Sequence, residues 1–473
     1  MRVAILSSEA VPFAKTGGLA DVAGALPKAL IEVGQDAVLL LPLFEQIKRE
    51  HLREKIIDNL DVGWRGGQYR AGVFYSEAPG APSFLIDAPE FFARNSIYGF
   101  RDDHLRFAFF CRASLALLRR LGAPPDVVHV NDWPGGFASA ELAQRRRYDP
   151  FYSRTRTLFS IHNLAYQGAF DPGDLWILGF SFEERDAFMM DGAASALKAG
   201  LMTADALSTV SPRYAQEIQT HEHGHGLDWL LRMRGDRLVG ITNGVDYDVW
   251  NPATDPHLPA HYDADNLEGK RACKLALLRE FMLPEELGRP IIANISRLTS
   301  QKGYDLIKEA AGAMLDAGAF FVALGSGASE YEDFLQGLRD YAPRRVGIYK
   351  GFNEPLAHRI EAGADIFLMP SLFEPCGLNQ MYSLRYGTVP VVRATGGLDD
   401  TVEDFDRVRG TGTGFKFGPY RAGAMLDKIY EALYCYAEPD VWARLQSNGM
   451  RADNSWQVAA RKYVQLYSAV TEL

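Results

Sequence analysis

The sequence has few cysteines, no long apolar run and no excess of basic residues. Its four cysteines, Cys111, Cys273, Cys376 and Cys435, are scattered among 473 residues without a CxxC pair. That pattern is more typical of free thiols in a reducing cytoplasm than of a disulfide framework. No apolar run approaches the roughly 18 residues that span a bilayer. Glu9 follows the short N-terminal apolar run at once, so we expect no signal peptide and a cytoplasmic protein.

Charge and two missing glycine signatures exclude further classes. The formal net charge of −10 argues against a nucleic-acid or membrane-surface partner bound mainly by electrostatics. A GxGxxG motif is missing, which disfavours a dinucleotide oxidoreductase. Lys15 does not belong to a Walker A loop, because no glycine stands five residues before it.

The length predicts two or three domains, and short apolar strands alternate with helix-length segments in both halves. This predicts an α/β fold with doubly wound parallel sheets. Residues 60–86 instead alternate in short runs and predict an antiparallel insertion. Residues 250–265 hold three prolines and little apolar periodicity, and are interpreted as the linker. We therefore expect an N-terminal domain over 1–250, a second over 251–450, and a C-terminal helix over 451–473 that packs back on the first.

The stretch 370–401 concentrates the features of a ligand site. It follows a short apolar strand and holds Glu374 in a turn rich in proline and glycine, and Gly377 is expected to open a helix that runs to Tyr386. A second strand leads to the pair Gly396–Gly397. Ligands bind where strand ends meet in open parallel sheets, so Glu374 is a candidate to hold a sugar hydroxyl or a ribose, or to stabilise developing positive charge; a helix N-cap carboxylate is the alternative.

Three basic residues follow strands and are candidates for binding phosphate. Lys15 precedes Gly17 and Gly18 ahead of a helix, an arrangement suited to an anion. Arg297 and Lys302 flank a strand-to-helix turn, and a diphosphate leaving group needs such positive charge when no metal supplies it. Surface lysines and arginines beside tight turns are the alternative for all three.

Polar and aromatic side chains after two other strands are candidates for sugar contacts. His162 and Asn163 follow one strand, and Asp132 and Trp133 follow another. A histidine in the core and a capping aspartate beside a packed tryptophan are the alternatives. Cys376 is interpreted as a thiol that lines the pocket. The loop histidines 221, 223 and 225 are more typical of a solvated loop than of a metal site.

Five motifs together resemble the bacterial glycogen synthases and their plant starch synthase relatives. They are KTGGLADV from Lys15, SIHNLAYQG from Ser160, NGVDYDVWNP from Asn243, SRLTSQKG from Ser296 and FEPCGLNQMYSLRYGTVPVVRATGGLDDTV from Phe373. They stand in the order of the family and span nearly the whole chain.

The resemblance implies a GT-B fold, two Rossmann-like domains facing across a cleft that closes on the substrate. It implies retaining transfer of glucose from ADP-glucose to the non-reducing 4-hydroxyl of an α-1,4-glucan such as glycogen, without a cofactor or metal. It places catalysis on His162, Glu374, Arg297, Lys302 and Asp132. Residues implied to bind ADP-glucose are Lys15, Gly17, Gly18, Asn163, Asn243, Arg297, Lys302, Phe352, Cys376, Gly377 and Leu378. Residues implied to bind the acceptor are Asp132, Trp133 and Tyr98. Oligomeric state is left without a prediction.

Three positions depart from the wider pattern. The glutamate usually found eight positions after Glu374 is Tyr382 here, as in other glycogen synthases. The loop HDWH of many relatives is Asn131–Asp132–Trp133–Pro134, and Phe352 replaces a frequent tyrosine. A UDP-glucose-dependent transferase and a catalytically silent glucan-binding protein remain as alternatives.

Overall fold

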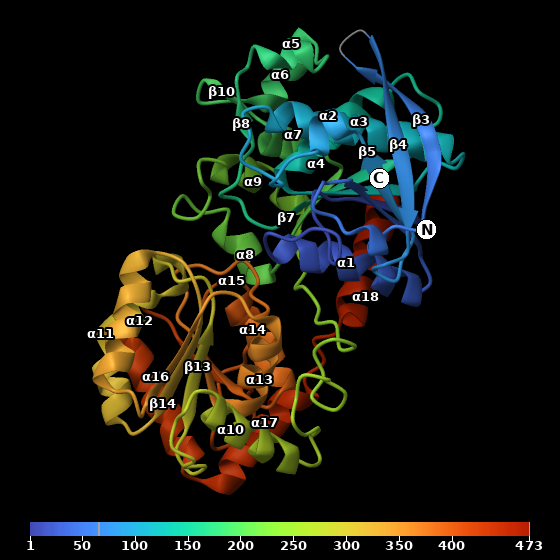
Figure 1. Ribbon diagram of the computed structural model, residues 1–473. Coiled ribbons are helices and arrows are strands. Elements are labelled where there is room, and N and C mark those ends of the chain that lie inside the picture. Colours follow the sequence, from blue (N-terminus) through green and yellow to red (C-terminus); the bar gives the residue numbers. More distant parts are fainter. Residues whose placement is uncertain (65–66, 473) are drawn as a thin grey trace. The chain divides into compact units, whose positions relative to one another are not determined.

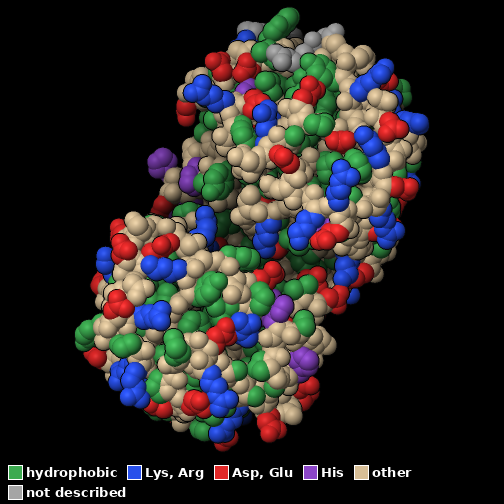
Figure 2. All heavy atoms as spheres, viewed as in Figure 1, with side chains coloured by type: hydrophobic (Ala, Val, Ile, Leu, Met, Phe, Trp, Pro, Cys, Tyr) green, Lys and Arg blue, Asp and Glu red, His purple; other side chains and the backbone are tan. Residues whose placement is uncertain are grey.

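The computed structural model describes residues 1–64 and 67–472, which form two compact units (Figure 1). One unit comprises Met1–Gly244 together with the C-terminal segment from Trp456 onward, and the other comprises Val245–Ser455. These boundaries lie a few residues from the predicted 250 and 450. Among the described residues, no helix has both the length and the apolar character to cross a bilayer. On the face shown in Figure 2, Lys and Arg side chains are interspersed with Asp and Glu.

A nine-stranded sheet organises the first unit. Its order is β12-β11-β7-β6-β1-β2-β5-β4-β3. The strands are β1 Arg2–Leu6, β2 Asp36–Pro42, β3 Glu54–Trp64, β4 Gly67–Ser76, β5 Ser83–Asp87, β6 Val127–Asn131, β7 Arg156–Ile161, β11 Ala206–Thr209 and β12 Leu238–Gly240. The seven strands from β12 to β5 pair in parallel. The strand order reverses between β1 and β6, which makes this the expected binding edge.

The antiparallel part of this sheet is the predicted insertion. β3 pairs antiparallel with β4, and β4 with β5, while β5 pairs in parallel with β2. The predicted range 60–86 includes residues 65 and 66, which lie outside the described residues. The insertion therefore extends the parallel sheet at one edge.

Helices and a small second sheet complete the first unit. The α-helices are α1 Gly18–Glu32, α2 Pro89–Phe92, α3 Asp103–Arg120, α4 Asp132–Arg145, α5 Asp174–Ile177, α6 Phe182–Phe188, α7 Ala196–Thr203, α8 Pro212–Glu217, α9 Asp228–Met233 and α18 Trp456–Thr471. The small sheet joins β8 Ala169–Phe170, β10 Ala193–Ser195 and β9 Met189–Met190, and the 3₁₀ turns are η1 Arg49–His51 and η2 Gly235–Arg237. α18 packs against α1 and β7. Its Tyr467 hydroxyl lies 2.8 Å from Nδ1 of His129 on β6.

The second unit is built on a six-stranded parallel sheet of order β15-β14-β13-β16-β17-β18. The strands are β13 Ile291–Ile295, β14 Phe320–Gly325, β15 Val346–Lys350, β16 Ile366–Met369, β17 Val389–Arg393 and β18 Phe415–Phe417. The helices are α10 Glu268–Glu280, η3 Ser300–Lys302, α11 Tyr304–Asp316, α12 Ser329–Tyr341, α13 Glu354–Gly363, α14 Asn379–Arg385, α15 Gly396–Thr401, α16 Ala422–Tyr436 and α17 Pro439–Arg451.

Both faces of this sheet are buried. Ile292 belongs to one apolar cluster, whereas its neighbours Ile291 and Ala293 belong to another. Successive side chains of a strand point to opposite faces, so the two clusters cover the two faces. Here the strand order reverses between β13 and β16.

Two sequence-based boundaries need correction. The helix expected from Gly377 to Tyr386 spans Asn379–Arg385, because Gly377 adopts φ +72° in the turn before it. The predicted linker 250–265 is a packed segment: Asp255 is 1% exposed, and its Oδ2 accepts a 2.5 Å hydrogen bond from the Tyr386 hydroxyl. His358 Nδ1 lies 2.7 Å from the same oxygen. The prolines and the lack of apolar periodicity suggested a linker, because neither feature of the sequence reports these tertiary contacts.

Candidate active site

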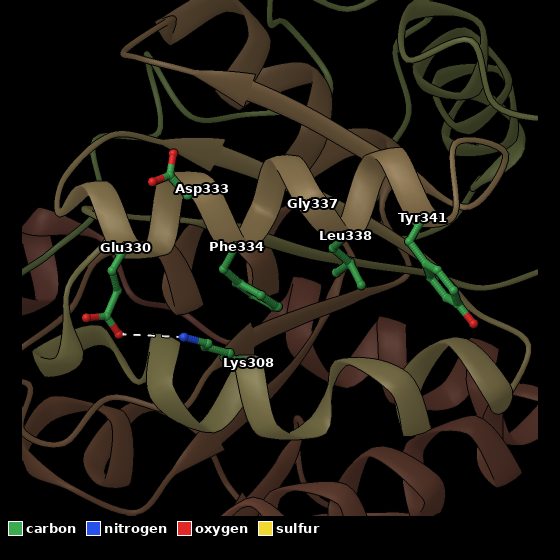
Figure 3. A pocket seen from close by; sticks show the side chains of 7 residues that line it. All are labelled: Lys308, Glu330, Asp333, Phe334, Gly337, Leu338 and Tyr341. Atoms are coloured by element: carbon green, nitrogen blue, oxygen red, sulfur yellow. Dashed lines mark ion pairs between the residues drawn. The ribbon is translucent and has the colours of Figure 1, made fainter.

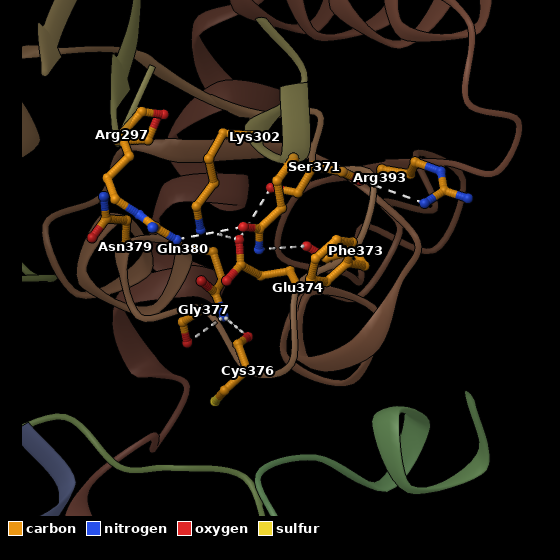
Figure 4. Close-up of polar contacts among 12 residues, drawn as sticks. Arg297, Lys302, Ser371, Phe373, Glu374, Cys376, Gly377, Asn379, Gln380 and Arg393 are labelled. Atoms are coloured by element: carbon orange, nitrogen blue, oxygen red, sulfur yellow. Dashed lines mark hydrogen bonds and ion pairs between the residues drawn. The ribbon is translucent and has the colours of Figure 1, made fainter. Parts of the chain in front are cut away.

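An ion pair lies at the strand reversal of the second sheet. Lys302 ends η3 after β13, and Glu374 follows β16; the Nζ of Lys302 contacts Oε2 of Glu374 (Figure 4). Glu374 is 6% exposed. The Ser371 hydroxyl donates a 3.1 Å hydrogen bond to the same Oε2. The sequence predicted both charged residues at this edge, but it did not predict that they pair.

Glycines shape the turn that holds Glu374. Gly396 adopts φ +45°, and a Cβ there would lie 1.9 Å from the Glu374 carbonyl oxygen. Gly397 donates its N–H to that oxygen at 3.1 Å. A Cβ on Gly397 would lie 2.1 Å from the Cys376 carbonyl. The start of α15 therefore packs against the turn so closely that only glycine fits.

The other residues of this unit that the sequence predicts to bind ADP-glucose differ in exposure. Arg297 is exposed, and its Nη2 donates a 3.4 Å hydrogen bond to Gln301. Cys376 is 5% exposed, whereas Phe352 is 79% exposed. Leu378 directly precedes α14 and is partly exposed. Arg297, Lys302 and Glu374 follow the two strands where the order reverses, and Phe352 follows β15 at one edge of the sheet.

The Lys15 loop of the first unit is held by a carboxylate that the sequence analysis missed. Glu9 is 4% exposed, and its Oε2 accepts hydrogen bonds from the backbone N–H groups of Thr16 and Gly17. Lys15 Nζ lies 2.6 Å from Oδ1 of Asp21, one turn into α1. The amide of Gly17 is thus already bonded within the protein, and Lys15 carries the cationic charge of this loop.

Asp132 and His162 lie together at the carboxyl ends of neighbouring strands β6 and β7. Asp132 adopts φ +52°, and its Oδ1 accepts the His162 N–H at 2.7 Å and the Asn163 N–H at 3.4 Å. Burial raises the pKa of Asp132 to about 7, against these two hydrogen bonds, which lower it. Burial lowers the pKa of His162 to about 4. At neutral pH the imidazole is uncharged.

Two predicted acceptor residues pack beside them. The rings of Tyr98 and Trp133 lie 6.3 Å apart, and Trp133 also meets Phe107 edge to face at 5.1 Å. The Tyr98 hydroxyl lies 2.7 Å from Ser8 Oγ and donates to Glu9 Oε1 at 3.1 Å. Burial and the Glu9 charge raise the pKa of Tyr98 well above its usual value. Both rings remain partly exposed.

Asn243 carries an unpaired buried acceptor. It follows β12 and is 7% exposed, and its Oδ1 has no hydrogen-bond partner within the described chain. A buried polar atom without a partner costs free energy. A ligand donor at this atom would remove that cost.

The described residues also bear on two other kinds of site, a metal centre and a surface hollow. The described residues contain no group of three or more His, Cys, Asp and Glu side chains that could hold a metal, the loop histidines included. A surface hollow of about 510 Å³ lies between α11 and α12 (Figure 3), lined by Lys308, Glu330, Asp333, Phe334, Gly337, Leu338 and Tyr341. None of the predicted site residues lines it.

Comparisons with known proteins agree with the two-unit architecture. Residues 2–233 match the family model "Starch synthase catalytic domain", and residues 280–447 match "Glycosyl transferases group 1". The catalytic domain of starch synthase IV from Arabidopsis thaliana, bound to ADP and acarbose, superposes with a TM-score of 0.92 at 33% identity, over 100% of this chain and 99% of that one. The sucrose-phosphate synthase of Thermosynechococcus elongatus shares the fold, with a TM-score of 0.62 at 19% identity over 99% of each chain.

These matches and the two doubly wound sheets define a glycosyltransferase of the GT-B class. The glycogen synthase of Geobacillus thermodenitrificans is 45% identical, over 99% of this chain and 97% of its own. That of Moorella thermoacetica is 44% identical, over 100% of this chain and 97% of its own. The chain belongs to the glycogen and starch synthase family, which confirms the resemblance drawn from the five motifs.

Proposed function

We propose that this glycosyltransferase elongates an α-1,4-glucan of the glycogen type. It transfers glucose from ADP-glucose to the non-reducing 4-hydroxyl with retention of configuration and releases ADP. We further propose that the reaction takes place in the cytoplasm and needs neither a metal nor a cofactor.

The observation that carries this proposal is the pair of Lys302 and Glu374 at the strand reversal of the second sheet. An ammonium group has three N–H donors. Lys302 can therefore maintain its ion pair with Glu374 while it donates a hydrogen bond to a phosphate oxygen. Arg297 adds a second positive charge at the end of the same strand. Such charge stabilises a departing diphosphate. Glu374 binds the glucosyl hydroxyls.

Residues of the first unit complete the assignment. Lys15, beside Gly17 and Gly18, contacts the nucleotide sugar, as do Asn163 and Asn243, whose buried Oδ1 accepts a donor from the ligand. His162 contacts the glucose near its reacting carbon. Asp132, Trp133 and Tyr98 bind the acceptor glucan, since an aromatic face and a carboxylate suit a sugar ring and its hydroxyls.

We infer same-face substitution as the route to retention. The bond between C1 and the phosphate oxygen breaks as the bond from the acceptor O4 to C1 forms, and the departing phosphate takes the acceptor proton. The contacts of Glu374 support this route, because two donors already engage its Oε2, as expected of a residue that binds rather than attacks. A glucosyl adduct trapped on Glu374 or Asp132 would overturn it.

The test is incorporation of labelled glucose into glycogen from ADP-glucose and from UDP-glucose, each with and without EDTA. We expect incorporation from ADP-glucose that EDTA does not reduce. Incorporation from UDP-glucose alone would contradict the donor assignment. A chain that binds glycogen but transfers from neither donor would instead be a glucan-binding protein.

Arg297→Ala provides a residue-level test of the diphosphate assignment. Arg297 makes one long hydrogen bond in the described structure, so its loss costs little stability. We expect glucose transfer to fall more than tenfold, the scale for one lost charged contact. The matched control is Arg279→Ala, an exposed arginine on α10 paired with Glu285, which we expect to leave transfer unchanged.

A further inference from the structure

Asn131 links two strands of the first sheet to His162. It is the last residue of β6, at the strand reversal, and is 2% exposed. Its Nδ2 donates a 3.0 Å hydrogen bond to the carbonyl oxygen of Leu6 on β1. Its Oδ1 lies 2.9 Å from Nε2 of His162, just beyond β7. One amide therefore spans three neighbouring strands.

The carbonyl of Leu6 determines which way this amide faces. A carbonyl oxygen accepts hydrogen bonds but cannot donate them. The NH₂ end of Asn131 must therefore face Leu6, and the oxygen must face His162. Because that oxygen can only accept, Nε2 of His162 must carry a proton.

The rest of the environment leaves His162 with a single ring proton. Asp132 accepts the backbone N–H of His162, and His129, two residues before Asn131, interacts electrostatically with His162. Glu9 acts at one remove, through its charge on Asp132. Burial lowers the pKa of His162 to about 4, so at neutral pH the ring is neutral and its proton sits on Nε2.

His129 does not compete for Asn131. Its Nδ1 lies 2.8 Å from the Tyr467 hydroxyl and its Nε2 lies 2.6 Å from Ser160 Oγ. Burial and the neighbouring His162 lower the pKa of His129 to about 3. The two histidines therefore have separate partners, and His162 alone depends on Asn131.

We propose that Asn131 is a positioning residue that holds His162 as its Nε2–H tautomer, which leaves Nδ1 as a hydrogen-bond acceptor. An acceptor nitrogen binds a hydroxyl group that donates, and it cannot protonate a leaving group. In the sugar transfer proposed above, on which this second half rests, Nδ1 of His162 therefore receives a hydrogen bond from a glucosyl hydroxyl and donates no proton to the departing phosphate.

The tautomer can be measured without reference to activity. The full-length protein is labelled with ¹⁵N and ¹³C in histidine, and the imidazole resonances are recorded at pH 7. The chain has 10 histidines, so the His162 signals are assigned as those missing from His162→Gln. We expect one neutral species protonated at Nε2. A neutral species protonated at Nδ1, or a charged ring, would overturn the proposal.

Two variants of Asn131 separate positioning from folding. Asn131→Leu removes the acceptor at similar volume, and we expect the hydrogen-bonded Nε2–H signal of His162 to disappear. Asn131→Asp keeps an acceptor and adds charge, so we expect the imidazolium form to persist to higher pH than in the wild type. Asn294→Leu removes the corresponding interstrand amide of the second sheet, whose Nδ2 donates to Leu368 at 2.8 Å, and must leave the His162 signals unchanged. His162 signals identical to wild type in both Asn131 variants would contradict the assignment, and if neither variant folds, the wild-type spectrum still decides.

Activity then tests the second half of the proposal. We expect Asn131→Leu to lower kcat about tenfold, with the Kd for ADP, which lacks the sugar, within twofold of wild type. Wild-type kcat in Asn131→Leu, with the tautomer signal lost, would show that Nδ1 does not contact the sugar. If the wild-type protein transfers no glucose at all, the proposed function fails while the tautomer assignment still stands or falls by its spectrum.

Discussion

Lys302 and Glu374 lie 72 residues apart in the chain, and their side chains form an ion pair at one oxygen, Oε2. Both side chains are largely buried, with 17% and 8% of their surfaces exposed. Removing one partner of a buried ion pair lowers the free energy of unfolding by more than the intact pair contributes to it, because the remaining charge is left buried without a partner. The two residues should therefore be changed together as well as singly.

Replacing Lys302 tests its role directly. We expect Lys302→Ala to lower glucose transfer more than tenfold and to lower the unfolding midpoint, because Glu374 remains buried and unpaired. Lys302→Met with Glu374→Gln should recover stability but not activity. Lys308→Ala on α11 is the control, since Lys308 is half exposed and lies 3.8 Å from Glu330. Normal transfer in Lys302→Ala would remove this lysine from the site.

A single methyl group at Gly396 should distort the Glu374 turn. The added Cβ would lie 1.9 Å from a backbone carbonyl at a positive φ, so neither atom can move aside cheaply. We expect Gly396→Ala to cost about 2–4 kcal/mol of unfolding free energy, measured by denaturant unfolding, and to reduce transfer. Gly312→Ala in α11 meets open space and should be neutral or stabilising. Equal stability of the two variants would refute the close approach.

Asp132 predicts a pH dependence of stability. Its pKa is about 7 in the folded protein and 3.8 as an ordinary carboxyl, so between these values the folded state binds more protons than the unfolded chain. The stabilisation that protonation of Asp132 gives the folded state is fully present below pH about 4, and it is lost as the pH rises to about 7.

The comparison that isolates this group is Asp132→Asn, which keeps an acceptor and tolerates a positive φ. We expect its stability, relative to wild type, to increase from pH 5 to pH 8 by about 2 kcal/mol or more. Denaturant unfolding at several pH values measures this. Asp236→Asn, at an exposed aspartate of the same unit, should show no such trend. A flat difference for Asp132→Asn would contradict the raised pKa.

Tyr382 has a packing role that a glutamate could not fill. Its ring stacks on Trp250 with centroids 3.9 Å apart, and Trp250 stacks on His358 at 3.7 Å. We expect Tyr382→Glu to cost about 1–3 kcal/mol by loss of stacking and burial, and Tyr382→Phe to cost less because the stack remains. Thermal unfolding of both variants measures the difference. A Glu variant as stable as the Phe variant would contradict this role.

Strand ends were the part of the site that the sequence could predict. Short apolar runs predict buried parallel strands, and the residues that follow such strands meet at one edge of the sheet. Arg297, Lys302 and Glu374 could be identified together for this reason. The same rule identified Asp132 and His162. The GT-B fold was predicted from the five motifs, each of which lies at such a strand end or turn.

Pairing within the site could not be predicted, because it depends on contacts between distant segments. Glu9 reads as one acidic residue after a strand, and only the folded loop shows that it binds the amides of Thr16 and Gly17. Asn131 was noted as a departure from HDWH, yet its function follows from the carbonyl of Leu6, far away in sequence. The segment 250–265 was misinterpreted for the same reason, since its Asp255 partners lie on α13 and beside α14.

The packing of α18 has a consequence for how the chain is made. This helix belongs to the first compact unit, but its residues are translated after those of the second unit. Until they emerge, His129 in the middle of the first sheet lacks its Tyr467 partner, and the surface of α1 that α18 covers stays open to solvent. The first unit is therefore completed only after all of the residues of the second unit have been translated.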